Sequence, residues 1–223
     1  MQIDEIIRSR RKTIALIVRG DGRLVIRAPL NLPDREIMRF VNQKAGWIRQ
    51  KQEEAQQRSA QIIARRFVEG ESFLFLGQAY PLHLTSRLHP ALVLQKDGFY
   101  LSRAALPQAK DTFTRWYKEQ ARLIFSKRLQ DYAARYGLSY KKIRISSART
   151  RWGSYSTTGT ISFTWRLVMA PLPVIDYIVV HELAHTLIRN HSDRFWSKVR
   201  AMMPEYKMYR EWLKHNGSSL TID

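Results

Sequence analysis

The stretch VVHELAHTLIRNHSDRFW, residues 179–196, decides the chemistry and the local fold of the second half of this chain. Its first part contains the pattern His-Glu-x-x-His at residues 181–185. On a helix, residues four apart lie on the same face, so His181 and His185 can direct their imidazoles to one point. Catalytic zinc binds neutral imidazoles and keeps one position open for water. Glu182 lies beside the pair, where its carboxylate can accept a proton from such a water.

A third ligand is expected from the residues that follow the helix. His191 comes six residues after His185, and Asn190 directly precedes it. Because asparagine tolerates left-handed backbone, Asn190 can end the helix and turn the chain back toward the metal, and Ser192 can then cap a new helix. The metzincins have the same histidine interval, but their glycine position is Ile188 here, so the chain does not match that group.

Composition limits the class of protein and its partners. The 223 residues include 38 Lys and Arg against 19 Asp and Glu, a formal net charge of +19. A charge this large indicates anionic partners such as nucleic acid, nucleotides or acidic protein surfaces. The absence of cysteine excludes disulfides, cysteine-ligated zinc, iron–sulfur clusters and thiol catalysis. No segment approaches the roughly 18 apolar residues that span a bilayer, so we expect a cytoplasmic protein without membrane contact.

The front half of the chain is rich in β-forming residues. Alternating apolar residues over 12–28, interrupted by Gly20-Asp21-Gly22, predict a hairpin. A helical period over 33–58 predicts one long helix, and short apolar runs over 66–103 predict strands. We therefore expect a β-rich N-terminal domain over residues 1–105 with one long helix.

The back half is mostly helical. We expect it to form a metal-binding catalytic domain over residues 106–223, so that the whole chain is of the α+β class. Its expected elements are a helix over 111–136 ended by Gly137, strands over 142–148 and 160–165, and helices after Pro173, near Ser192 and near Glu205.

The segment Arg151-Trp152-Gly153-Ser154 lies between the two strands that precede the metal helix. In zinc peptidases a strand edge near the metal often binds an extended substrate by strand addition, and Gly153 would let another backbone approach closely. Trp152 can either pack in the core or form a wall of the cleft. We take Trp152 and Gly153 as candidate substrate-binding residues.

Basic residues crowd the same segment. Arg149 and Arg151 form either a solvated basic face or a clamp for a substrate carboxylate or phosphate, because guanidinium binds both in a bidentate manner. Arg151 and Tyr206 are the candidates for stabilising the oxyanion of the transition state.

A run of further landmarks surrounds these residues, and with them the sequence resembles the YgjP-like metallopeptidase family, which is related to the SprT-like and WLM zincins. The resemblance is dense over about residues 110–215 and looser in the front half, through Lys12-Thr13 and Phe75-Leu76-Gly77. The landmarks are Arg151-Trp152-Gly153-Ser154, Gly159, Trp165-Arg166-Leu167, Ala170-Pro171, Asp176-Tyr177, the His-Glu-x-x-His pattern, Asn190-His191-Ser192 and Phe195-Trp196.

The resemblance implies a small gluzincin-like catalytic unit attached to a β-rich N-terminal domain. It also implies three zinc-binding histidines, at His181, His185 and His191, and a catalytic glutamate at Glu182. One departure is visible, because relatives commonly carry cysteine at the position of Tyr155. A thiol-dependent role at that position is therefore excluded.

Three functions remain open from the sequence. The first is a zinc-dependent hydrolase, foremost a peptidase, with Glu182 as general base. The second is a metal-dependent nucleoside triphosphate pyrophosphatase acting on UTP-type substrates, a proposal made within the family resembled here that the positive charge would suit. The third is a non-catalytic basic protein that binds nucleic acid. The expected partners are peptides, proteins or anionic nucleotides, with accessory contacts to nucleic acid through the basic surface.

Overall fold

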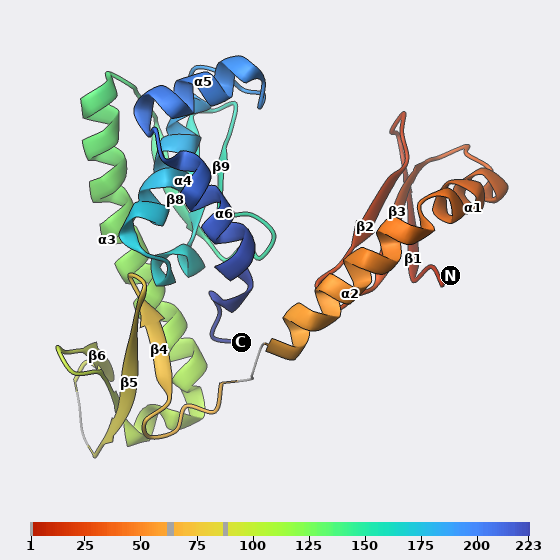
Figure 1. Cartoon of the computed structure of the whole chain (residues 1–223). Coiled ribbons are helices and arrows are strands. Elements are labelled where there is room, and N and C mark those ends of the chain that lie inside the picture. Colours follow the sequence, from red (N-terminus) through yellow and green to blue (C-terminus); the bar gives the residue numbers. More distant parts are fainter. Residues whose placement is uncertain (1, 62–64, 87–88) are drawn as a thin grey trace. The chain divides into compact units, whose positions relative to one another are not determined.

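A computed structural model describes residues 2–61, 65–86 and 89–223, without the side chains of residues 57–61. The chain divides into two compact units, Met1–Ile63 and Ala64–Asp223 (Figure 1). Strands dominate the start of the chain and helices its second half, which confirms the α+β class predicted from the sequence. No helix among the described residues is long and apolar enough to cross a membrane.

The first unit is a small sheet covered by helices on one face. Strand β3 is central, with β1 parallel and β2 antiparallel to it, so the predicted hairpin is confirmed as β2–β3. Leu24, Ile26 and Ala28 of β3 are fully buried against Ile37 and Ile48 of the helices. The described elements are β1 (Glu5–Ser9), β2 (Ala15–Val18), β3 (Leu24–Pro29), α1 (Asp34–Gln43) and α2 (Ala45–Gln61).

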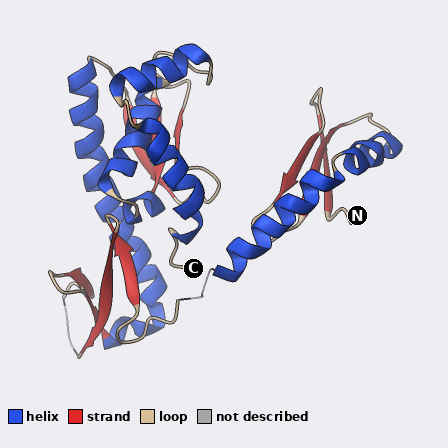
Figure 2. Ribbon diagram, viewed as in Figure 1, coloured by secondary structure: helices blue, strands red, loops and turns tan. Residues whose placement is uncertain are grey.

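The single helix predicted over residues 33–58 is wrong, because α1 and α2 are separated at Lys44. Lys44 leaves helical geometry with φ −101° and ψ 13°. Figure 2 shows the two helices as separate ribbons. Ile48 of α2 still joins Ile37 and Val41 of α1 in one core.

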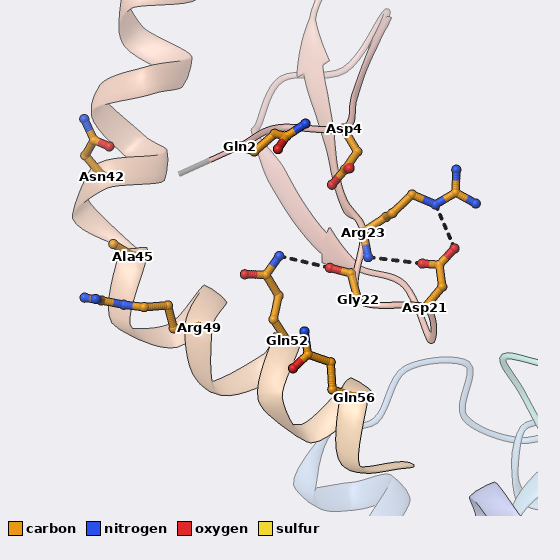
Figure 3. Close-up of a pocket in the computed structure, with 10 residues that line it drawn as sticks. All are labelled: Gln2, Asp4, Asp21, Gly22, Arg23, Asn42, Ala45, Arg49, Gln52 and Gln56. Atoms are coloured by element: carbon orange, nitrogen blue, oxygen red, sulfur yellow. Dashed lines mark hydrogen bonds and ion pairs between the residues drawn. The ribbon is translucent and has the colours of Figure 1, made fainter. Parts of the chain in front are cut away.

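A cavity of about 660 Å³ lies in the first unit, between the β2–β3 turn and the helices (Figure 3). Its lining is polar: Gln52 Nε2 donates to Gly22 O at 3.0 Å, and Arg23 pairs with Asp21 at 2.8 Å. Asp4 accepts a hydrogen bond from the backbone N–H of Leu24. Gln52, Asp4 and Arg23 thus have partners within this unit, and we assign no chemistry to this cavity.

The second unit contains two sheets, with strand orders β4-β5-β7-β6 and β8-β10-β9. In the second sheet β10 is central, parallel to β8 and antiparallel to β9, so β9 lies at an edge. The strands of the second unit are β4 (Ser72–Phe75), β5 (Gln78–Thr85), β6 (Leu92–Leu94), β7 (Phe99–Ser102), β8 (Lys142–Ser146), β9 (Gly153–Tyr155) and β10 (Thr160–Thr164). Its helices are η1 (Arg103–Gln108), α3 (Ala109–Tyr136), η2 (Trp165–Met169), α4 (Leu172–Ala184), α5 (Asp193–Met202), α6 (Tyr206–Asn216) and η3 (Gly217–Ser219).

Helix α3 joins both sheets into one core (Figure 1). Near its start, Phe113 stacks on Phe73 of β4 with ring centroids 4.3 Å apart. Farther along, Phe125 stacks on Phe163 of β10 at 4.6 Å. The helix ends as predicted at Gly137, whose left-handed φ of 63° glycine adopts without strain.

This shared core moves the domain boundary. The sequence predicts a boundary between residues 105 and 106, but the structure divides the chain after Ile63. The reason is that β4, β5 and β7 bury Phe73, Leu82 and Phe99 against α3 and not against the first unit. The prediction from strand content therefore assigned residues 66–103 to the first unit, whereas they belong to the second.

Candidate metal centre

Helix α4 presents the first two histidines and Glu182. It is buried over most of its length, with Val179, Val180 and Leu183 fully enclosed in the core. Arg128 of α3 donates two hydrogen bonds to the carboxylate of Asp176, and this partly buried pair links α4 to α3. Helix packing on several sides therefore holds the backbone of the His-Glu-x-x-His pattern in place.

The chain turns sharply after α4 and returns His191 to the first two histidines. The helix ends at Ala184, with His185 as its C-cap, and Leu187 N donates to Ala184 O in the turn that follows. The predicted left-handed conformation of Asn190 is wrong, since positive φ among described non-glycine residues occurs at Phe67 and Leu76. The short turn at residues 185–187 reverses the chain instead.

The three histidines direct nitrogen atoms to one point. One ligand nitrogen from each of His181, His185 and His191 lies within 4.8 Å of the others. The Nε2 atoms of His181 and His191 are 3.1 Å apart. Two ligands at about 2.0–2.1 Å from one tetrahedral zinc ion would be separated by about 3.3 Å. The donor set and its spacing therefore fit a zinc ion, and we call these residues the histidine trio.

Hydrogen bonding and burial prepare the trio to bind a cation. His185 Nδ1 donates to Ile188 O at 3.0 Å, which leaves Nε2 of the same ring with its lone pair free. Burial lowers the pKa of His181 to about 3, and burial also lowers the pKa of His185. Both rings are therefore neutral at pH 7, as metal ligands must be. His181 Nδ1 is buried without a hydrogen-bond partner among the described residues.

Aromatic side chains of α5 confine the rings of the trio. Phe195 stacks on His185 with centroids 4.4 Å apart, and Trp196 stacks on His191 at 5.7 Å. The guanidinium of Arg210 lies 4.7 Å from the centroid of the Trp196 ring. Ring rotation of the ligands is therefore restricted before any metal binds.

Glu182 is buried beside the trio, with 4% of its surface exposed. Burial raises its pKa to about 8, although the positive charge of Arg151 acts in the opposite direction. Its Oε2 atom has no hydrogen-bond partner among the described residues. A carboxyl group in such a site can take up and release a proton near neutral pH.

Glu182 and the trio line one cavity of about 310 Å³, which lies between α4 and the edge strand β9. The remaining residues of its lining come from β9, from the turn that follows this strand and from the loop that precedes α5: Gly153, Ser154, Tyr155, Ser156, Thr157 and Arg189. Of the five predicted substrate-binding residues, Gly153 is in this lining. Arg189 was not among the predicted residues, although its position between His185 and His191 is a signal that could have identified it.

The other predicted substrate-binding residues take different positions. Arg149 pairs with Asp223 at 3.0 Å, and Arg151 is exposed without a hydrogen bond or ion pair among the described residues. Trp152 packs against Gly217 and the core of the second unit. Of the two alternatives for this side chain, the structure therefore has the packed one. Tyr206 is buried, stacks on Trp196 with centroids 5.5 Å apart and does not line the cavity.

Comparison with known proteins gives the family of this chain. The family model described as YgjP-like, metallopeptidase domain, matches residues 12–216. The crystal structure of the metallopeptidase zymogen of Pyrococcus abyssi abylysin is similar at 23% identity and a TM-score of 0.39, covering 41% of this chain and 93% of that chain. No curated protein matches. Because the family model includes the histidine trio, Glu182 and most of both units, the chain belongs to the YgjP-like metallopeptidase family.

Proposed function

We propose that the protein is a zinc-dependent peptidase in which the histidine trio holds the metal and Glu182 is the general base. The observation that supports this most is the convergence of three imidazole nitrogens within 4.8 Å beside a buried carboxyl group in one cavity. Bound zinc would lower the pKa of a coordinated water to about 7 and polarise the scissile carbonyl. His191, which also lines the cavity, is the most exposed of the three histidines.

The chain's own residues supply proton transfer and substrate orientation. Glu182 accepts a proton from the attacking water at a carboxylate oxygen and delivers it to the departing amine. The edge strand β9 has a paired side against β10 and lines the cavity with Gly153 and Ser154. An extended peptide can add to its other side through main-chain hydrogen bonds, which would align the peptide across the cavity.

A second candidate substrate is a nucleoside triphosphate, which two arginines could bind. Arg189 lines the cavity, and neither Arg189 nor Arg151 has a hydrogen bond or ion pair within the described part of the chain. Arg149, in contrast, is paired with Asp223. A guanidinium group can form two parallel hydrogen bonds to either a phosphate or a carboxylate. These two arginines therefore suit a triphosphate or an acidic peptide.

The test is a side-by-side hydrolysis screen of zinc-loaded wild type and Glu182→Gln on unfolded proteins, peptides and the four nucleoside triphosphates. Gln is nearly isosteric with Glu but accepts no proton at neutral pH. We expect turnover of the best substrate to fall by about 10²–10⁴-fold with stoichiometric zinc retained. Glu119→Gln, an exposed change on α3, is the matched control and should leave turnover unchanged.

The outcomes separate the candidate functions. Cleavage of peptides supports the first candidate, whereas hydrolysis confined to nucleoside triphosphates and weakened by Arg151→Ala and Arg189→Ala supports the second. A zinc-replete Glu182→Gln protein with wild-type rates would remove Glu182 from the mechanism. A wild type without any turnover that binds nucleic acid would favour the non-catalytic alternative.

A further inference from the structure

Gly153 of β9 and Glu182 of α4 lie so close together that a residue with a side chain at position 153 would collide with Glu182. A Cβ atom added to Gly153 would lie 2.7 Å from both Cγ and Cδ of Glu182, and closer still to Oε1. Real Cβ contacts essentially never fall below 3.0 Å. The Glu182 carboxyl group therefore occupies the space in which a side chain at position 153 would begin.

The backbone of Gly153 does not itself require glycine. Positive φ values occur among the described glycines at Gly22, Gly70, Gly77, Gly137 and Gly159, and Gly153 is not one of them. Alanine can adopt the conformation of this strand residue without strain. The need for glycine at position 153 therefore comes from Glu182.

Strand β9 cannot easily move away from Glu182. Gly153 is in register with Phe163 of β10, and Thr164 N donates to Trp152 O at 3.0 Å. The Trp152 ring in turn is packed against Gly217, where an added Cβ would lie 2.7 Å from its Cζ2 atom. A shift of β9 would break these contacts, so a side chain at position 153 would displace the flexible end of Glu182 instead.

Hydrogen bonds do little to hold the Glu182 carboxyl group in place. Its Oε2 atom is buried and has no partner in the part of the chain that the structure describes. Packing therefore defines where the carboxyl group sits, and the bare face of Gly153 is one wall of that space. A displacement of about 1 Å at a reacting group can lower a rate by about 10²-fold.

We propose that Gly153 is a positioning residue, whose missing side chain creates the space that places the Glu182 carboxylate beside the metal site. This proposal rests on the proposed role of Glu182 as general base. It assigns Gly153 a task within the protein, in addition to the close approach of a substrate backbone expected from the sequence.

The first test is Gly153→Ala in the zinc-loaded full chain. We expect kcat to fall by about 10–100-fold while KM and zinc stoichiometry change little, because the histidine trio is untouched. In the Glu182→Gln background the same change should lower kcat no further. Gly46→Ala is the matched control, since an added Cβ there meets nothing within 4 Å, and it should leave kcat at the wild-type value.

The second test needs no activity and uses thermal unfolding. Gly153→Ala should lower Tm in the wild-type background but not in Glu182→Ala, where the atoms that it would meet are removed. If Gly153→Ala alone fails to fold, the double variant should still fold. Equal loss of Tm in both backgrounds, or wild-type kcat in Gly153→Ala, would overturn the proposal. Wild-type turnover in Glu182→Gln would instead refute the general base, and the unfolding comparison would still report on the contact.

Discussion

Of the three histidines proposed as metal ligands, His191 is the one that α4 and its C-cap do not supply. His181 and His185 are held on one face by the helix and its C-cap, whereas His191 comes from the loop before α5 and is exposed. We expect His191→Ala to lose most of its zinc on dialysis, because two imidazoles make a poor zinc site. Elemental analysis measures the occupancy, and circular dichroism should show an intact fold. His215→Ala, an exposed change on α6, is the control that keeps its zinc.

This outcome is specific to the ligand role. A histidine that only stacks on Trp196 would leave the metal content unchanged when removed. Full zinc occupancy in His191→Ala would therefore take His191 out of the ligand set and require a different third ligand.

Asp223 connects three separate elements of the second unit. Its carboxylate pairs with Lys110 of α3 at 3.0 Å, with Arg149 before β9 at 3.0 Å and with Arg166 of η2 at 3.1 Å. Burial would raise the pKa of Asp223, but hydrogen bonds from Lys110, Thr221 and Arg166 outweigh it and hold the pKa well below its ordinary value. A lowered pKa means that the ionised carboxylate stabilises the folded state.

The pH dependence of stability follows from that sign. The contribution of Asp223 is fully present above the unfolded pKa of about 3.9 and is lost as pH falls toward the folded pKa. We expect Asp223→Asn to lower the free energy of unfolding by about 1–2 kcal/mol at pH 7, since the Arg166 partner is largely buried. Urea unfolding between pH 7 and pH 3 should show this difference shrinking below about pH 4. A difference that stays constant down to pH 3 would contradict the expectation.

The division of the whole molecule predicts that the second unit is a folding unit. Its core contains both sheets, α3 and α4, and the core residues of the first unit form a separate cluster. We expect residues 65–223 alone to unfold in one cooperative transition and to bind one zinc ion. Calorimetry and zinc titration provide the measurements. A fragment 106–223, cut at the boundary predicted from the sequence, is the comparison and should fail to fold, because it lacks Phe73, Leu82 and Phe99 of the shared core.

The sequence by itself determined the features that depend on short spacing. The meeting of His181, His185 and His191 follows from one helical turn and a six-residue interval, the β2–β3 hairpin from alternation around a glycine turn, and the end of α3 from Gly137. These arrangements involve neighbours along the chain, so helix and strand periods are sufficient to predict them.

Only the tertiary structure decided which distant segments share a core and which side chains meet across it. The strands over residues 72–102 joined α3 and not the first unit, Tyr206 was buried against Trp196, and Arg149 paired with Asp223. The contact of Gly153 with Glu182 belongs to the same class. Such contacts join residues that are not neighbours along the chain. Local propensity carries no information about them, because packing of the complete core selects them.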